Sequence, residues 1–244
     1  MPNLPPPPAL DELVAEFPVA LFLDFDGTLI ELAPGPEEVF IPEHIPPLLI
    51  ALAERLDQRL AIVSGRAVEW LHAAGLEKHV LSGTHGGELL WPGLEVERTE
   101  RPAVLDRIDA AFRTFADERP GVIVERKALA AGLHFRKVPE HGEAALALAR
   151  EWGRTSGLAV QPGKMMVELR LPGGSKGSAI TALMKREPFT GAVPVFLGDD
   201  ITDEDGFEAA NAFGGFGIAI GERESANARF HLPDVEAVHR WLAI

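Results

Sequence analysis

Two aspartates separated by a single residue, Asp24 and Asp26, lie within the stretch LFLDFDGTLI at residues 21–30. An apolar run that ends at a glycine is typical of a buried strand, and burying two like charges without partners is costly. Either the strand ends early and both carboxylates are solvated, or a cation binds between them. The second interpretation gives the pair a chemical role.

Three other polar groups follow apolar runs or begin a predicted helix: Ser64, Lys176 and the pair Asp199-Asp200. Each has an ordinary explanation alone, as a helix cap, an exposed lysine or a solvated turn. Ligands of open α/β sheets, however, bind at the carboxyl ends of the strands. Carboxylates there suit Mg²⁺, and a lysine with a small hydroxyl suits phosphoryl oxygens. The order of these groups along the chain therefore favours a phosphoryl site over coincidence.

The residues around Lys176 read GGSKG, which does not fit the G-x-x-x-x-G-K-[ST] pattern of nucleoside-triphosphatase loops. A phosphate-binding role for this lysine must therefore rest on its place among the other groups.

The elements that must position these groups alternate between strand and helix. Strands are predicted at 19–24, 60–63, 80–82, 193–197 and 216–220. Helices are predicted at 9–16, 45–56, 69–74, 176–185, 205–211 and 234–242. Continuous apolar strands with helical crossovers predict an α/β protein with a Rossmann-like, doubly wound parallel sheet.

The middle of the chain has a different pattern. Helices are predicted at 104–118 and 143–155, and strands at 121–125, 131–136 and 165–171. We therefore expect a core formed by residues 1–97 and 172–244, with a smaller α+β cap domain inserted at 98–171.

Composition narrows the class of partner. The 244 residues carry a formal net charge of −14, which disfavours non-specific binding to nucleic acid or anionic membranes. There are no cysteines, so thiol catalysis and disulfides are excluded. No apolar run is long enough for a membrane span, and the proline-rich beginning does not look like a signal peptide. We expect a cytoplasmic protein that acts on a small molecule.

The four motifs DFDGTL, VSGR, GGSKG and GDD resemble, in this order, the signature of haloacid-dehalogenase (HAD) phosphatases. Further phrases are similar to the trehalose-6-phosphate phosphatase family within that superfamily. They are GTHGGE at 83–88, ERKALAAGLHFR at 125–136, KMMVELR at 164–170 and GDDITDEDGFEAAN at 198–211. The resemblance extends from about residue 21 to residue 220.

The resemblance implies a mechanism. Asp24 would attack phosphorus and form an aspartyl-phosphate, while Asp26 would act as general acid and then as general base. Mg²⁺ would be held by Asp24, the backbone carbonyl of Asp26 and Asp199, with Asp200 or Asp203 in support. Phosphoryl oxygens would be bound by Ser64, Lys176 and the backbone at Gly27 and Thr28.

The resemblance also implies residues that bind the substrate's sugar and phosphate. They are Gly65, Arg66, His85, Gly86, Arg126, Lys127, His134, Arg136, Lys164 and Glu168. Which of the adjacent cations Arg126 and Lys127 faces the pocket stays open. His134 and Arg136 alternate as the residues of any half-exposed strand would.

The expected reaction is Mg²⁺-dependent hydrolysis of trehalose 6-phosphate to trehalose and phosphate. Alternatives are another sugar phosphate, such as sucrose phosphate or mannosyl-phosphoglycerate, a phosphomutase, or a sugar-phosphate-binding module without turnover. The chain has no room for a fused glycosyltransferase, so a trehalose-6-phosphate synthase partner would be a separate chain.

Overall fold

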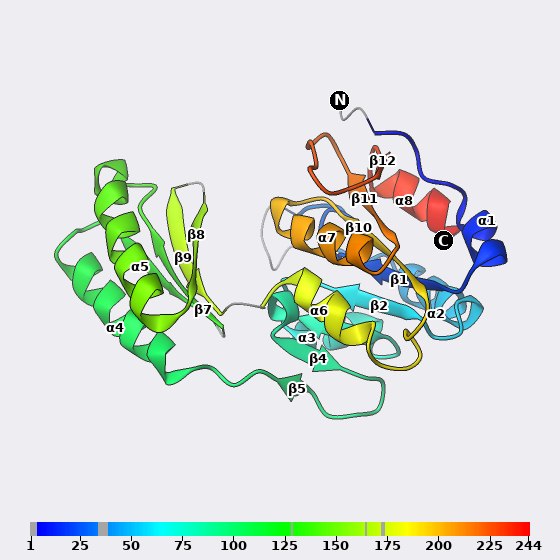
Figure 1. Cartoon of the computed structure of the whole chain (residues 1–244), viewed down its shortest axis with the longest axis horizontal. Helices are drawn as coiled ribbons and strands as arrows, with labels where there is room; N and C mark the ends of the chain where they lie inside the picture. The colour runs from blue at the N-terminus through cyan, green and yellow to red at the C-terminus, as the bar shows by residue number, and fades with distance from the viewer. Residues whose placement is uncertain (1–3, 34–38, 128, 164, 172–173) are drawn as a thin grey trace. The chain divides into compact units, whose positions relative to one another are not determined.

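The computed structural model describes residues 4–33, 39–127, 129–163, 165–171 and 174–244. The chain forms two compact units, drawn in Figure 1: a core unit of Met1–Arg98 and Ser175–Ile244, and an inserted unit of Thr99–Gly174. Among the described residues, no helix is both long and apolar enough to cross a membrane.

The core unit is built on an eight-stranded sheet with the order β12-β11-β10-β1-β2-β3-β4-β5. Six strands are parallel: β1 (Val19–Leu23), β2 (Leu60–Val63), β3 (Val80–Gly83), β10 (Val193–Gly198), β11 (Phe216–Ile220) and β12 (Phe230–Leu232). Two strands are antiparallel: β4 (Glu88–Leu90) and β5 (Glu97–Arg98). The central strands β1 and β2 are buried along their whole length, as their continuous apolar sequences require.

Helices cover both faces of this sheet. One face packs against α1 (Leu10–Glu16), α2 (Ile45–Arg55), α3 (Val68–Leu71) and α8 (Val235–Leu242). The other packs against α6 (Lys176–Leu183) and α7 (Glu204–Ala212). The alternation along β1 explains the two layers, since Leu21 belongs to the first core and Phe22 to the second.

The inserted unit is an antiparallel sheet with helices on one face. Its strand order is β6-β7-β9-β8, with β6 (Ile123–Arg126), β7 (Ala130–His134), β8 (Ala159–Gly163) and β9 (Met166–Arg170). Residues from α4 (Ala103–Asp117) and α5 (Gly142–Ser156) form one apolar core with alternate strand residues, among them Leu133, Val167 and Leu169. The opposite sheet face carries polar strand residues, among them Glu125, His134 and Glu168.

The predicted α/β class and the doubly wound core are confirmed. Both sheets are larger than expected, because β4, β5 and β12 of the core sheet and β8 of the inserted unit were not predicted. Strands β4, β5 and β12 have only two or three residues each, and β8 includes both Pro162 and Gly163. Strand pairing partners, rather than local sequence, define such elements.

Candidate active site

Lys176 and Asp24 meet at the carboxyl edge of the core sheet. Asp24 directly follows β1, where its backbone N–H donates to the carbonyl of Leu197 at 3.0 Å. The Lys176 ammonium donates to Asp24 Oδ1 and to Asp203 Oδ1, both at 2.6 Å. Asp24 and Lys176 are each only 3% exposed, so this charge cluster is buried.

The start of α6 explains how Lys176 reaches this position. Ser175 caps the helix: its hydroxyl accepts from the Ser178 N–H, and Ser178 Oγ accepts from the Ser175 N–H. A lysine in the first turn is disfavoured by the helix dipole. The carboxylates of Asp24 and Asp203 compensate for this, which points to a functional reason for the placement.

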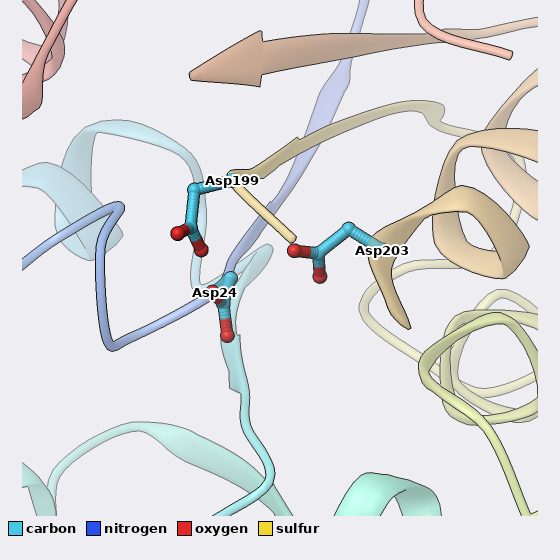
Figure 2. Close-up of side chains that lie close together, drawn as sticks. All are labelled: Asp24, Asp199 and Asp203. Atoms are coloured by element: carbon cyan, nitrogen blue, oxygen red, sulfur yellow. The ribbon is translucent and has the colours of Figure 1, made fainter. Parts of the chain in front are cut away.

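Three carboxylates from two strand ends converge at the same place. Oxygen atoms of Asp24, Asp199 and Asp203 all lie within 4.8 Å of one another. Figure 2 shows these three side chains close together; Asp24 directly follows β1 and Asp199 directly follows β10. Asp203 belongs to a 3₁₀ turn at Ile201–Asp203, and its Oδ2 accepts from the backbone N–H of Asp200 at 2.9 Å. Asp200 itself is exposed and is not part of this cluster.

The electrostatics of the cluster favour a bound cation. Burial raises the pKa of Asp24 to about 6, although Lys176 opposes the shift. Burial and then the charge of Asp203 raise the pKa of Asp199 to about 6, and burial followed by the charge of Asp24 raises that of Asp203 to about 7. Burial alone would lower the pKa of Lys176, but the two carboxylates raise it above its usual value.

The donor set fits Mg²⁺ in both chemistry and charge. All three groups offer hard carboxylate oxygens, the ligands that Mg²⁺ prefers. When ionised, three carboxylates facing one ammonium leave two uncompensated negative charges. A divalent cation balances this excess.

Gly27 allows the two acidic strand ends to approach each other. Its φ is +81°, and a Cβ built there would lie 2.2 Å from Asp199 Oδ2. No other residue fits, because both the backbone conformation and the contact exclude a side chain. Next to it, the buried Thr28 hydroxyl lies 3.5 Å from Asp24 Oδ2.

Asp26 faces a different partner from Asp24. Its carboxylate accepts two hydrogen bonds from Arg66, one from Nε at 2.6 Å and one from Nη2 at 2.7 Å. The guanidinium of Arg66 also stacks on Trp70, with its central carbon 4.0 Å from the ring centroid. Asp26 is therefore paired with an arginine that also stacks on an aromatic ring.

The loops after β2 and β3 pack closely together. Ser64 is buried, its carbonyl accepts from the His85 N–H at 3.0 Å, and its hydroxyl accepts from the Arg66 N–H at 3.1 Å. A Cβ on Gly65 would lie 2.7 Å from the His85 ring, and one on Gly86 would lie 2.5 Å from the Ser175 carbonyl. These contacts hold together the loops at the carboxyl ends of β2 and β3, which contain the predicted residues Ser64, Gly65, Arg66, His85 and Gly86.

The open sheet face of the inserted unit carries its own polar cluster. The Lys127 ammonium donates to Glu168 at 2.5 Å and lies 3.5 Å from Glu125. His134 shares a 2.8 Å hydrogen bond with Glu125. Glu168 lies between the fully buried Val167 and Leu169, so it projects to the opposite face, as its strand position requires.

The alternation of side chains along β6 separates the two adjacent cations. Arg126 lies opposite Ala131, a core residue, and pairs with Asp109 of α4 at 2.8 Å. Lys127, one residue later, joins Glu168 on the open face. The structure thus groups Lys127, and not Arg126, with the other predicted sugar-binding residues.

Arg136 is exposed and lines a cavity of about 570 Å³ together with Glu125 and His134. The predicted residue Lys164 lies outside the described residues. Sequence reasoning missed Glu125, although it begins the quoted phrase ERKALAAGLHFR. It also missed Arg223, which donates to the carbonyls of Asp199 and Asp200 at 3.3 and 3.0 Å and so supports the acidic loop.

The sequence of the chain is similar to the sequences of known phosphatases. A family profile described as Trehalose-phosphatase matches residues 22–236. Over 237 residues the chain is 38% identical to a trehalose-6-phosphate phosphatase of Escherichia coli (strain K12), with 95% of this chain and 87% of that protein covered.

Two solved structures share the fold. Aspergillus fumigatus trehalose-6-phosphate phosphatase is 24% identical, with a TM-score of 0.79 over 99% of this chain and 98% of that one. A phosphatase of the haloalkanoate (HAD) enzyme superfamily from Bacteroides thetaiotaomicron is 18% identical, with a TM-score of 0.65 over 93% of each chain.

Proposed function

Because the chain belongs to the trehalose-phosphatase family, we propose that it hydrolyses trehalose 6-phosphate to trehalose and inorganic phosphate. The observation that carries the proposal furthest is the ion pair between Lys176 and Asp24 within the buried acidic cluster. This ion pair lies where a nucleophilic carboxylate, a cation for phosphoryl oxygens and ligands for a divalent ion come together, at the carboxyl ends of the central strands.

The Asp24 carboxylate is the nucleophile in this proposal. It attacks phosphorus, a new oxygen–phosphorus bond forms, and the bond from phosphorus to the sugar oxygen breaks. An anionic nucleophile and an anionic substrate repel each other. Lys176, 2.6 Å from Asp24, lowers this repulsion and binds a phosphoryl oxygen.

The acidic cluster is proposed to hold Mg²⁺ through Asp24, Asp199 and Asp203. When bound, Mg²⁺ neutralises charge on the phosphoryl oxygens and keeps the carboxylates ionised. The resemblance leaves open whether Asp200 or Asp203 is the further Mg²⁺ ligand. We assign this role to Asp203, because its carboxylate lies inside the cluster. The backbone carbonyl of Asp26 remains a further proposed ligand.

Asp26 serves as the proton-transfer group. It donates a proton to the departing sugar oxygen, and it then accepts a proton from the water that attacks the aspartyl-phosphate. The products are trehalose, inorganic phosphate and the regenerated Asp24 carboxylate. In its ionised form the Asp26 carboxylate accepts a hydrogen bond from Arg66 at each oxygen, so Asp26 must take up a proton and release one of these bonds before it donates to the sugar oxygen.

The inserted unit is proposed to act as the cap that binds the sugar. Its open sheet face presents Glu125, Lys127, His134 and Glu168, and these donors and acceptors suit sugar hydroxyls. Cap closure would exclude bulk water from the reacting phosphate.

The test is phosphate release from trehalose 6-phosphate, with and without Mg²⁺, by the wild type and by Asp24→Asn. We expect activity that needs Mg²⁺ and is lost in the variant. Undiminished activity of Asp24→Asn would overturn the nucleophile assignment. A tenfold higher kcat/KM for sucrose phosphate or mannosyl-phosphoglycerate, about 1.4 kcal/mol, would overturn the substrate assignment.

The same experiment separates the other functions. A phosphomutase would require a bisphosphate activator and would yield an isomeric sugar phosphate instead of inorganic phosphate. A binding module would bind trehalose 6-phosphate without releasing phosphate.

A further inference from the structure

Asp109 is a buried carboxylate in the middle of α4 in the inserted unit. It is 0% exposed, and its Oδ2 accepts from Arg101 Nη2 at 2.7 Å and from Arg126 Nη1 at 2.8 Å. Its Oδ1 has no hydrogen-bond partner among the described residues. A buried carboxylate lowers the stability of the fold unless cations compensate its charge. The position of Asp109 therefore indicates a role other than stability.

Arg101 connects this buried charge to the β6–β7 hairpin. Its Nη1 donates to the backbone carbonyl of Lys127 and to that of Ala130, the second at 3.2 Å. The Lys127 N–H in turn donates to the Ala130 carbonyl at 3.1 Å. One guanidinium therefore joins both sides of the hairpin connection and is itself anchored on Asp109.

The residue whose backbone is held in this way is Lys127. A lysine side chain has four rotatable bonds, so its ammonium can occupy many positions unless its backbone is fixed. The Lys127 ammonium lies 2.5 Å from Glu168 and 3.5 Å from Glu125, at the polar cluster of the open sheet face. The Arg101 contacts fix the start of this side chain, and the two glutamates fix its end.

We propose that Arg101, anchored by Asp109, is a positioning residue that holds Lys127 in place for the substrate's sugar. The proposal rests on the proposed function, in which Lys127 contacts the disaccharide. The described donors of Arg101 are directed to Asp106, to Asp109 and to the hairpin carbonyls, so its effect on substrate binding is through Lys127. Arg126 adds a second positive charge against Asp109, but its side chain is 51% exposed.

A double-mutant cycle tests this coupling by steady-state kinetics with trehalose 6-phosphate and Mg²⁺. The variants are Arg101→Met, Lys127→Ala and the combination of both. We expect Arg101→Met to raise KM about threefold to thirtyfold with little change in kcat, and to have no further effect on KM when Lys127 is already alanine. An equal rise of KM in both backgrounds would overturn the proposal.

Arg119→Met is the matched control. Arg119 lies in the same unit just after α4, is partly buried and donates to the backbone carbonyl of Phe115, in the last turn of that helix, at 3.1 Å. Its removal should leave KM at the wild-type value. If Arg119→Met raises KM as much as Arg101→Met does, the effect of Arg101 is general destabilisation and the proposal fails.

Arg101→Lys keeps the experiment informative if the methionine variant does not fold. Lysine retains a positive charge opposite Asp109 but lacks the planar fork that reaches both the carboxylate and the hairpin carbonyls. We expect a raised KM for this variant also. A wild-type KM would show that charge alone suffices, which contradicts positioning through the hairpin.

A readout that needs no turnover separates this proposal from the proposed function. The NMR signal of the Lys127 ammonium in the full chain should shift in Arg101→Lys and stay unchanged in Arg119→Met. If trehalose 6-phosphate is not hydrolysed but the signal shifts as expected, the proposed function fails while the link from Arg101 to Lys127 stands. An unchanged signal in Arg101→Lys would overturn the link itself.

Discussion

The ammonium of Lys176 and the carboxylate of Asp24 form a buried ion pair of 2.6 Å, although 152 residues separate them in the chain. The two residues come from a helix start and a strand end on the same edge of the core sheet. Lys176 also contacts Asp203 at the same distance, so one cation faces two of the three clustered carboxylates.

Lys176→Met tests the role of this ion pair in catalysis. Without the ammonium, Asp24 and Asp203 face each other unscreened, and the phosphoryl group loses a positive partner. We expect kcat/KM for trehalose 6-phosphate to fall by about 10²–10³-fold. Lys185→Met, which removes an exposed lysine just beyond the same helix, should retain wild-type activity. Similar activity of the two variants would contradict the role of Lys176.

The raised pKa values of the acidic cluster predict that Mg²⁺ binding depends on pH. In the protein without the ion, the pKa is about 6 for Asp24 and Asp199 and about 7 for Asp203. Because Mg²⁺ binds the ionised carboxylates, protons must leave at low pH, so affinity should rise between pH 5 and 8. Calorimetry in buffers of different ionisation enthalpy measures both the affinity and the released protons.

Two variants identify the groups responsible. Asp199→Asn should weaken Mg²⁺ binding strongly, whereas Asp200→Asn alters an exposed residue outside the cluster and should weaken it less. Affinity that does not change with pH, or equal losses in the two variants, would contradict the assignment.

Gly27→Ala tests the close approach of the acidic strand ends. A Cβ at Gly27 would lie 2.2 Å from Asp199 Oδ2 and would displace that carboxylate. Gly214→Ala is the control, because Gly214 has nearly the same φ, +82°, with open space around it. Both variants should lose about 1 kcal/mol of unfolding free energy through backbone strain. Only Gly27→Ala should also lose Mg²⁺ affinity and activity; retention of both would contradict the packing argument.

We expect the buried imidazole of His79 to lower the stability of the fold at acidic pH. His79 is 2% exposed, neither ring nitrogen has a partner among the described residues, and burial lowers its pKa from 6.5 to about 4. Between pH 6.5 and pH 4 the imidazole of His79 therefore binds a proton in the unfolded chain but not in the folded protein. The resulting decrease in the free energy of unfolding grows as pH falls from 6.5 to 4 and reaches roughly 3 kcal/mol near pH 4.

Denaturant unfolding at several pH values measures this effect as a difference between variants. His79→Phe should remove this part of the pH dependence, while the same substitution at the exposed His72 should leave it intact. If the His79→Phe and wild-type stability curves stay parallel from pH 7 to pH 4, the buried imidazole has no such effect.

The sequence predicts the core strands well because their signal is local. The run at 60–63 reads as a buried strand and is one, and the aspartates that follow β1 and β10 lie at the sheet edge as expected. Strand β5, in contrast, is only Glu97–Arg98, two exposed charged residues that pair with β4 through tertiary contacts. Nothing in its sequence distinguishes it from a loop.

The parts of the site that the sequence did not predict depend on tertiary contacts. Asp109 lies in an amphipathic helix, where an aspartate is ordinarily solvated, and its burial depends on arginines at positions 101 and 126. The choice between Arg126 and Lys127 depends on which face β6 turns to the core, and this required the strand register.

The most direct test of the central claim is the location of the phosphoryl group during turnover. The wild type is mixed with trehalose 6-phosphate and Mg²⁺, quenched in acid within one turnover, and its peptides are analysed by mass spectrometry. We predict a phosphoryl group on Asp24, absent without substrate and absent in Asp24→Asn. Hydrolysis with a phosphoryl group on another residue, or undiminished hydrolysis by Asp24→Asn, would contradict it.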